Sequence, residues 1–167
     1  MLKTFLWLLL ILVVVVIGGT LGLRLWARSA KRPANLGVNN GKLAPCPDTP
    51  NCVSTQATQD SQKMAALSYT GPLADAKAHL LKVVQAMPRV ELLTEQDNYL
   101  AFVFRSRLIG YPDDVEFYFD DAAKQIHFRS ASRLGKGDMG VNRARMEAIS
   151  KAFAAQASMT PFKRIEM

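Results

Sequence analysis

The chain has 167 residues, a formal net charge of +7 and only two cysteines. A chain of this length fits one domain with its own hydrophobic core, and such a domain needs neither a metal nor several disulfides to fold. Most of the excess charge lies before Pro33, and the rest of the chain carries a net charge of about +2. A nearly neutral domain lacks the broad positive field of a nucleic-acid-binding protein, so no nucleic-acid partner is expected.

The first feature along the chain is an uncharged apolar stretch from Phe5 to Leu23, FLWLLLILVVVVIGGTLGL. At 1.5 Å per residue, a helix of this length crosses about 30 Å of hydrocarbon. A cleaved signal peptide with an ARSA site at residues 27–30 is the alternative. The apolar core exceeds the usual length of about 7 to 15 residues in signal peptides, so residues 1–32 are predicted to be a retained single-pass membrane anchor with a basic flank.

Residues 33–61 are rich in Pro, Asn, Gly and Thr, which predicts a tether and an irregular arm. Cys46 and Cys52 both lie in this arm, and the prolines between them restrict the loop enough to make a disulfide plausible. Free structural thiols and reactive or metal-bound thiols are the alternatives. No metal or cofactor is predicted, because two thiols with the distant His79 and His127 do not form an obvious metal site.

Two arguments about the orientation of the anchor conflict. More basic residues follow the apolar stretch than precede it, which favours a cytoplasmic location for the globular part. A disulfide persists in an oxidising compartment, which favours the other side of the membrane.

The predicted α+β domain covers residues 62–158, and residues 159–167 form a tail. Its first elements are a short strand at 64–69 and a helix that begins near Pro72 and ends before Pro88. A second strand follows from Arg89 to Thr94.

Three further strands are predicted by a period of two in the stretches NYLAFVFRSR, DDVEFYFD and KQIHFRSASR. One side of these strands is apolar and gathers Leu100, Phe102, Phe104, Val115, Phe117, Phe119, Ile126 and Phe128. A last helix from Val141 to Gln156 carries an apolar face, and Asp138 or Asn142 could cap its start. The order β-α-β-β-β-β-α predicts a helix-grip-like antiparallel sheet of about five strands with both helices on its apolar face.

The other face of the sheet is rich in charge and is the predicted ligand-binding site, together with a glycine-rich turn before the last helix. The predicted ligand-binding residues are Arg105, Asp114, Glu116, His127, Arg129, Arg133, Asn142 and Arg143. Arginine holds carboxylate or phosphate groups with a planar fork, which indicates an anionic ligand or a protein partner. The alternative is mutual neutralisation, in which cross-strand pairs such as Glu116 with Arg129 only stabilise a solvated face.

Two other classes of function remain open. An enzyme could use Asp113, Asp114, Glu116 and His127 as acid and base and Ser130 or Ser132 as nucleophile, but the serines alternate to the face opposite His127. No catalytic residue is therefore assigned. A carrier of lipid or another apolar ligand would need a cavity between sheet and helix, whereas the aromatic residues there are by default core.

Three stretches carry a family resemblance: LGVNNGKLAPCPDTPNCVSTQ, FRSRLIGYPDDVEFYFD and IHFRSASRLGKGDMGVNRARMEAI. In this order, from about Leu36 to Phe153, they resemble the bacterial and plastid family catalogued as domain of unknown function 1499. The resemblance implies a small domain that often follows a membrane segment or export signal, with its cysteine pair at Cys46 and Cys52. Thr55 departs from the pattern, where a second serine is expected. No activity comes with this family.

The family's habit of export favours the periplasmic side of the membrane despite the basic flank. The sequence therefore predicts a single-pass protein of the bacterial inner membrane whose periplasmic, non-catalytic domain binds an anionic ligand or a partner protein.

Overall fold

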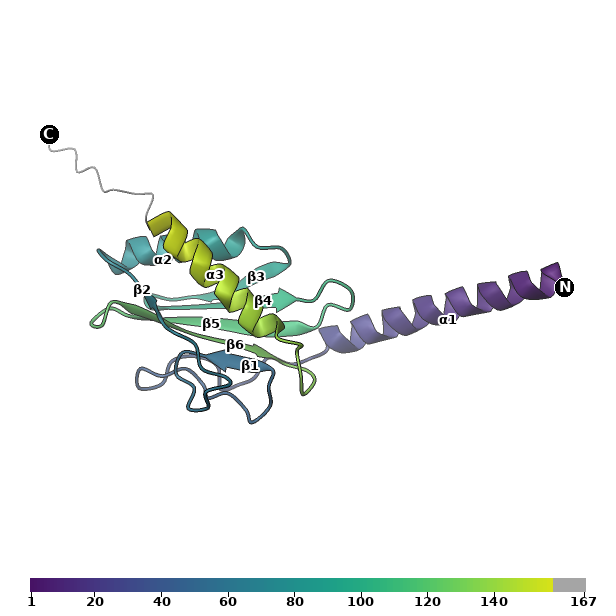
Figure 1. The fold of residues 1–167 in the computed structure, drawn as a ribbon, viewed down its shortest axis with the longest axis horizontal. Coiled ribbons are helices and arrows are strands. Elements are labelled where there is room, and N and C mark those ends of the chain that lie inside the picture. Colours follow the sequence, from purple (N-terminus) through teal and green to yellow (C-terminus); the bar gives the residue numbers. More distant parts are fainter. Residues whose placement is uncertain (158–167) are drawn as a thin grey trace, which may run out of the picture.

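The computed structural model describes residues 1–157, so the predicted tail lies outside the described residues. The described chain forms an N-terminal helix, six strands and two further helices (Figure 1). The elements are α1 (Leu2–Arg28), β1 (Cys52–Ser54), β2 (Leu67–Ser68), α2 (Leu73–Gln85), β3 (Val90–Glu95), β4 (Tyr99–Arg105), β5 (Pro112–Asp120), β6 (Gln125–Ser132) and α3 (Val141–Ala157). The α+β fold and the order of the predicted elements are confirmed.

The strands form one antiparallel sheet in the order β1-β6-β5-β4-β3, and β2 pairs with β6 beside β1. The alternating stretches of the sequence became β4, β5 and β6, whose register places Phe102 opposite Val115 and Phe117 opposite Phe128. The strand β1 was not predicted. It has only three residues, all of them buried, so neither its length nor an alternation reveals it in the sequence.

The hydrophobic core lies between the apolar face of the sheet and the helices α2 and α3, which Figure 1 shows on the same side of the strands. Phe102, Phe117 and Phe128 are fully buried. Phe117 contacts the other two edge to face, with ring centroids 6.0 Å and 6.4 Å away. Edge-to-face aromatic pairs stabilise a core beyond their buried area, by about 0.5–1.5 kcal/mol each.

The helix ends follow local chemistry. Pro88 lies just beyond α2 and cannot continue it, because proline has no amide hydrogen and clashes with the preceding turn. At the start of α3, the carboxylate of Asp138 accepts hydrogen bonds from the backbone N–H groups of Gly140 and Asn142, at 3.0 Å and 2.8 Å. Asp138, one of the two predicted caps, thus satisfies amides that the helix leaves without partners.

The second face of the sheet is covered by residues 33–51, which are the part of the predicted arm before β1. From here on, the arm means these residues. Leu43 of the arm packs on Tyr99 and Ala101 of β4, and Gly37 N–H donates to the Glu116 carboxylate at 2.8 Å. Glu116 is 0 % exposed and Asp114 is 2 % exposed. The charged face is therefore not solvated at these two acids, in contrast to the solvated face of the alternative considered above. Each buried acid has a guanidinium partner, which makes its burial tolerable.

The helix α1 projects from one end of the domain (Figure 1) and exposes nearly all its apolar side chains. It is long and apolar enough to cross a membrane, a property that a signal sequence near the N-terminus shares. Its last turn contacts the domain. Ala27 is fully buried, and the Trp26 ring meets Tyr111 edge to face at 6.2 Å.

Candidate functional site

Glu116 and Arg129 form an ion pair at the centre of the covered sheet face. The two residues are direct neighbours across β5 and β6, as the cross-strand pairing predicted from the sequence requires, and Arg129 Nη1 lies 3.4 Å from Glu116 Oε2. The second carboxylate oxygen accepts the Tyr99 hydroxyl at 2.7 Å as well as Gly37 N–H. In the described chain Arg129 Nε–H is buried without an acceptor, so this guanidinium keeps one donor unused.

Tyr99 on this face has a raised pKa, to which burial and the charge of Glu116 contribute. Burial is the main cause that raises the pKa of the Tyr99 phenol, followed by the negative charge of Glu116 and the hydrogen bond to it. Burial disfavours the phenolate, and a nearby carboxylate repels it. Tyr99 therefore stays a neutral donor to Glu116.

A second pair, Asp114 with Arg133, lies farther along the same face. The guanidinium holds the carboxylate with two parallel hydrogen bonds, of 2.8 Å and 2.7 Å. Arg133 Nη1 also donates to the backbone oxygen of Ala30 at 3.1 Å, so this pair ties the end of α1 to the sheet. Such bidentate pairs fix geometry as well as charge.

The opposite face of the sheet holds a third buried acid. Asp113 pairs with Arg145 of α3, a residue that the sequence did not single out. Arg145 Nη1 also donates to Ser130 Oγ and Asn142 Oδ1, and the Ser130 hydroxyl donates to the same amide oxygen at 2.6 Å. These groups attach the start of α3 to the sheet by a buried hydrogen-bond network.

The groups considered for catalysis are divided between the two faces. His127 lies on the arm side, where its Nδ1 is 3.2 Å from Thr55 Oγ1 and its ring stacks on Tyr118. Ser130 is occupied by Asn142 on the helix side. Ser130 and His127 therefore do not form the Ser-His pair of a hydrolase.

The remaining predicted site residues are Arg105, Asn142 and Arg143, and their side chains contact groups outside the predicted set. Arg105 is half-exposed and forms a long pair with Glu91, at 3.9 Å. Arg143 donates to the backbone oxygens of Ser61 and Lys63, at 2.7 Å and 3.3 Å. Asn142 is fully buried. The ligand-binding role of the eight predicted residues stays a prediction, and most of them contact other protein groups.

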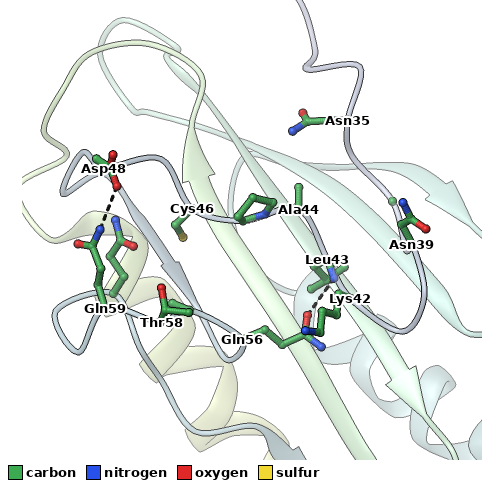
Figure 2. A pocket seen from close by; sticks show the side chains of 14 residues that line it. Asn35, Asn39, Lys42, Leu43, Ala44, Cys46, Asp48, Gln56, Thr58 and Gln59 are labelled. Atoms are coloured by element: carbon green, nitrogen blue, oxygen red, sulfur yellow. Dashed lines mark hydrogen bonds between the residues drawn. The ribbon is translucent and has the colours of Figure 1, made fainter.

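An open cleft of about 560 Å³ lies between the arm and the loop after β1 (Figure 2). We call it the arm cleft. Its walls mix polar and apolar groups. The lining residues are Asn35, Gly37, Asn39, Lys42, Leu43, Ala44, Pro45, Cys46, Asp48, Gln56, Ala57, Thr58, Gln59 and Gln62. Cys46 is bonded to Cys52 with a Cα–Cα distance of 5.7 Å, which confirms the predicted disulfide.

Glutamine side chains clamp the two walls of the arm cleft together. Gln56 accepts from Leu43 N–H at 2.9 Å and donates to the Gly41 oxygen at 3.0 Å. The buried Gln62 donates to the oxygens of Pro47 and Thr49, at 2.7 Å and 3.1 Å. Sequence reasoning missed both clamps, and the only signal was the position of Gln56 at the end of the first quoted family stretch.

Four polar side chains of the cleft lack such contacts. Asn35, Asn39, Lys42 and Thr58 are exposed, and their side chains make no hydrogen bond or ion pair with the described residues 1–157. Figure 2 shows Asn35, Asn39 and Lys42 on the arm and Thr58 on the facing loop. They are free to contact a ligand.

Comparison with known proteins agrees with the motifs. No curated protein matches the chain. A family model matches residues 42–153, which include β1 to β6 and most of α3 as well as part of the arm. The chain belongs to this family, described as Protein of unknown function (DUF1499).

Proposed function

We propose that this protein is a membrane-anchored, non-catalytic binding domain that takes a carboxylate-bearing ligand into the arm cleft. The observation that carries this proposal is the combination of a clamped cleft with unpaired polar side chains on its walls. Concave sites with a few fixed polar groups are typical ligand sites.

The charges of the arm cleft favour an anionic ligand. Lys42 and Asp48 are its charged lining residues. Asp48 already accepts a hydrogen bond from Gln59 at 3.0 Å, whereas the Lys42 ammonium has no partner in the described chain. A ligand carboxylate would pair with Lys42 and accept further bonds from the amides of Asn35 and Asn39.

Several independent contacts hold the arm cleft in shape before any ligand arrives. The Cys46–Cys52 disulfide and the Gln56 and Gln62 clamps join its walls. Gly37, a lining residue, is held by Glu116. The predicted residues Glu116 and Arg129 thus support binding by positioning the arm. A preformed site loses less conformational entropy on binding.

The contacts of α1 support a retained anchor. The residues around the possible signal cleavage site, 27–30, are part of the folded domain, since Ala27 is fully buried and the Ala30 oxygen accepts from Arg133. Cleavage there would remove both contacts. The disulfide supports an oxidising location for the domain, which for a bacterial inner-membrane protein is the periplasm.

The proposal is tested with the full-length protein in nanodiscs of neutral phosphatidylcholine, by NMR of backbone and side-chain amides. Glutarate and a tetraglutamate peptide serve as probes for a small acid and for acidic protein segments. We expect at least one of them to shift the amide signals of Asn35, Asn39 and Thr58 in a saturable way, with weak affinity in the millimolar to micromolar range.

The Lys42→Ala variant should lose this binding, because the ligand loses its charge partner. Lys63→Ala is the matched control, since Lys63 is also exposed but does not line the cleft. If neither acid shifts these signals, or if both variants bind like the wild type, the proposed function is wrong.

A further inference from the structure

A second cleft, of about 370 Å³, lies where α1 leaves the domain, and its charges are strongly unbalanced. Its charged lining residues are one carboxylate, Glu91, and the guanidinium groups of Arg24, Arg28, Arg89, Arg105 and Arg107. We call it the arginine cleft. The Arg105–Glu91 pair is long, at 3.9 Å, and both side chains are substantially exposed to solvent. Screening by water makes such a pair weak, so most of the positive charge is not neutralised.

Backbone carbonyls orient two of these arginines and leave their terminal nitrogens unused. Arg24 Nε donates to the Leu108 oxygen at 2.9 Å, and Arg89 Nε donates to the Arg105 oxygen at 3.1 Å. The Nη groups of Arg24 and Arg89 make no hydrogen bond within the described residues. A guanidinium fixed in this way presents a planar pair of donors, which matches two oxygens of a phosphate.

Exposed apolar side chains gather at the same end of the domain. After α1, the described residues that expose large apolar side chains are Val38, Leu108, Met139 and Val141. Leu108 is 73 % exposed and Met139 is 103 % exposed. Leu108 lies in the loop between β4 and β5 and Met139 in the loop before α3, and Figure 1 shows both loops at the end from which α1 projects.

The contact between α1 and the loop between β4 and β5 fixes the position of that loop relative to a membrane that α1 would cross. Arg24 directly follows the apolar stretch that ends at Leu23, so it marks the boundary between hydrocarbon and headgroups. Leu108 is hydrogen-bonded to Arg24, and Trp26 contacts Tyr111 at the other end of the loop. Aromatic side chains favour this boundary.

We infer that the arginine cleft binds the phosphate headgroup of an anionic phospholipid in the leaflet where α1 ends, while Leu108 and Met139 enter the headgroup region. The charge excess matches the negative charge of an anionic headgroup, and the exposed apolar side chains find an apolar environment in the headgroup region. A phosphate ion in solution would account for the arginines but would leave these apolar side chains in water.

The inference is tested by native mass spectrometry of the full-length protein in detergent, with equal amounts of phosphatidylglycerol and phosphatidylcholine added. We expect phosphatidylglycerol adducts to predominate. The double variant Arg89→Gln/Arg107→Gln should bind phosphatidylglycerol about 30-fold more weakly, because two of the cations that attract the headgroup are lost. Its melting temperature serves as the control for folding.

The double variant Lys63→Gln/Lys151→Gln removes the same charge from exposed positions outside the arginine cleft and should bind like the wild type. Equal adducts of both lipids, or equal losses in the two double variants, would overturn the inference.

A second measurement does not depend on these variants. A nitroxide on Leu108→Cys can be attached selectively, because both native cysteines are in the disulfide. Its accessibility is measured by electron paramagnetic resonance in nanodiscs that contain phosphatidylglycerol. The label should be more accessible to oxygen, which partitions into the membrane, than to a water-soluble nickel complex. The reverse ratio would place the loop in water and contradict the inference. Neither measurement involves the arm cleft, so the proposed function and this inference can fail separately.

Discussion

Glu116 is the side chain at which the buried polar contacts of the arm face meet. Its carboxylate receives Arg129, the Tyr99 hydroxyl and Gly37 N–H, and it is fully buried. Burial of a charge is tolerated only when such partners replace the lost water. The net contribution of the Glu116–Arg129 pair to the free energy of unfolding is therefore small, whereas removal of one partner destabilises the protein strongly.

Removal of one partner of this pair should strongly destabilise the protein. Glu116→Ala leaves the guanidinium of Arg129 buried without its counter-charge, and we expect the free energy of unfolding to fall by about 3–5 kcal/mol. Denaturant unfolding followed by circular dichroism measures this change. The double variant Glu116→Leu/Arg129→Met is the control and should recover most of the loss, because it leaves no charge unpaired. A single variant as stable as the wild type would show that the pair is not buried in solution.

The raised pKa of Tyr69 predicts that the stability of the fold decreases at alkaline pH. Burial, followed by the hydrogen bond to Asp121, raises the pKa of the Tyr69 phenol to about 12, from about 10 in the unfolded chain. The folded state therefore holds this proton more tightly, and its contribution to stability is complete below about pH 10 and is lost as the pH rises toward 12.

The Tyr69→Phe variant should lose less stability over this range than the wild type, as measured by denaturant unfolding at each pH. Parallel curves for the two proteins would contradict the assigned cause. Tyr99 should ionise only on unfolding, because burial and Glu116 raise its pKa as well.

At the scale of the elements, the disulfide links the arm to β1. Cys46 lies in the arm and Cys52 begins the strand, six positions later. Loss of this short bridge should lower the free energy of unfolding by about 2 kcal/mol, because the loop it closes in the unfolded chain is small.

This loss can be measured by denaturant unfolding with and without reductant. Reductant should have no effect on Cys46→Ser/Cys52→Ser, which is the control. If reductant leaves the wild type equally stable, the bridge does not stabilise the fold.

The elements with a clear apolar period were predicted from the sequence, and the strand without one was missed. Phe117 and Phe128 alternate with polar residues and Phe102 recurs with Leu100 and Phe104 at a period of two, and this pattern is enough to predict β4, β5 and β6 together with their apolar face. The strand β1 is short and irregular, so no period could reveal it. Its pairing with β6 depends on contacts distant in the chain.

The candidate site was predicted less completely, for a physical reason. Alternation placed Glu116 and Arg129 on one face correctly, but it does not show what covers that face. The arm has no periodic pattern, and its position depends on single contacts such as Gly37 with Glu116 and Gln56 with Leu43. Such contacts are specified only in the folded chain, so the arm cleft could not be predicted.

At the scale of the whole molecule, the disulfide and α1 together predict a topology. In intact cells, a membrane-impermeant maleimide should label the protein only after an impermeant reductant has opened the Cys46–Cys52 bond. The variant Cys46→Ser/Cys52→Ser/Ser61→Cys should be labelled without reductant, because Ser61 is exposed. Labelling of this variant only after cell lysis would place the domain in the cytoplasm.

Both proposed sites depend on how the chain is arranged around the sheet, with helices on one face and the arm on the other. The arm cleft exists only if the arm stays in contact with β4 and β5. The arginine cleft depends instead on the contact of α1 with the loop before β5.

Hydrogen exchange of the Gly37 amide, in the full-length wild type and in Glu116→Ala, tests the position of the arm most directly. We expect slow exchange in the wild type, because this N–H donates to a buried carboxylate, and fast exchange in the variant while the amides of α2 remain protected. Fast exchange at Gly37 in the wild type would show that the arm does not cover the sheet, and the arm cleft would then not exist in solution.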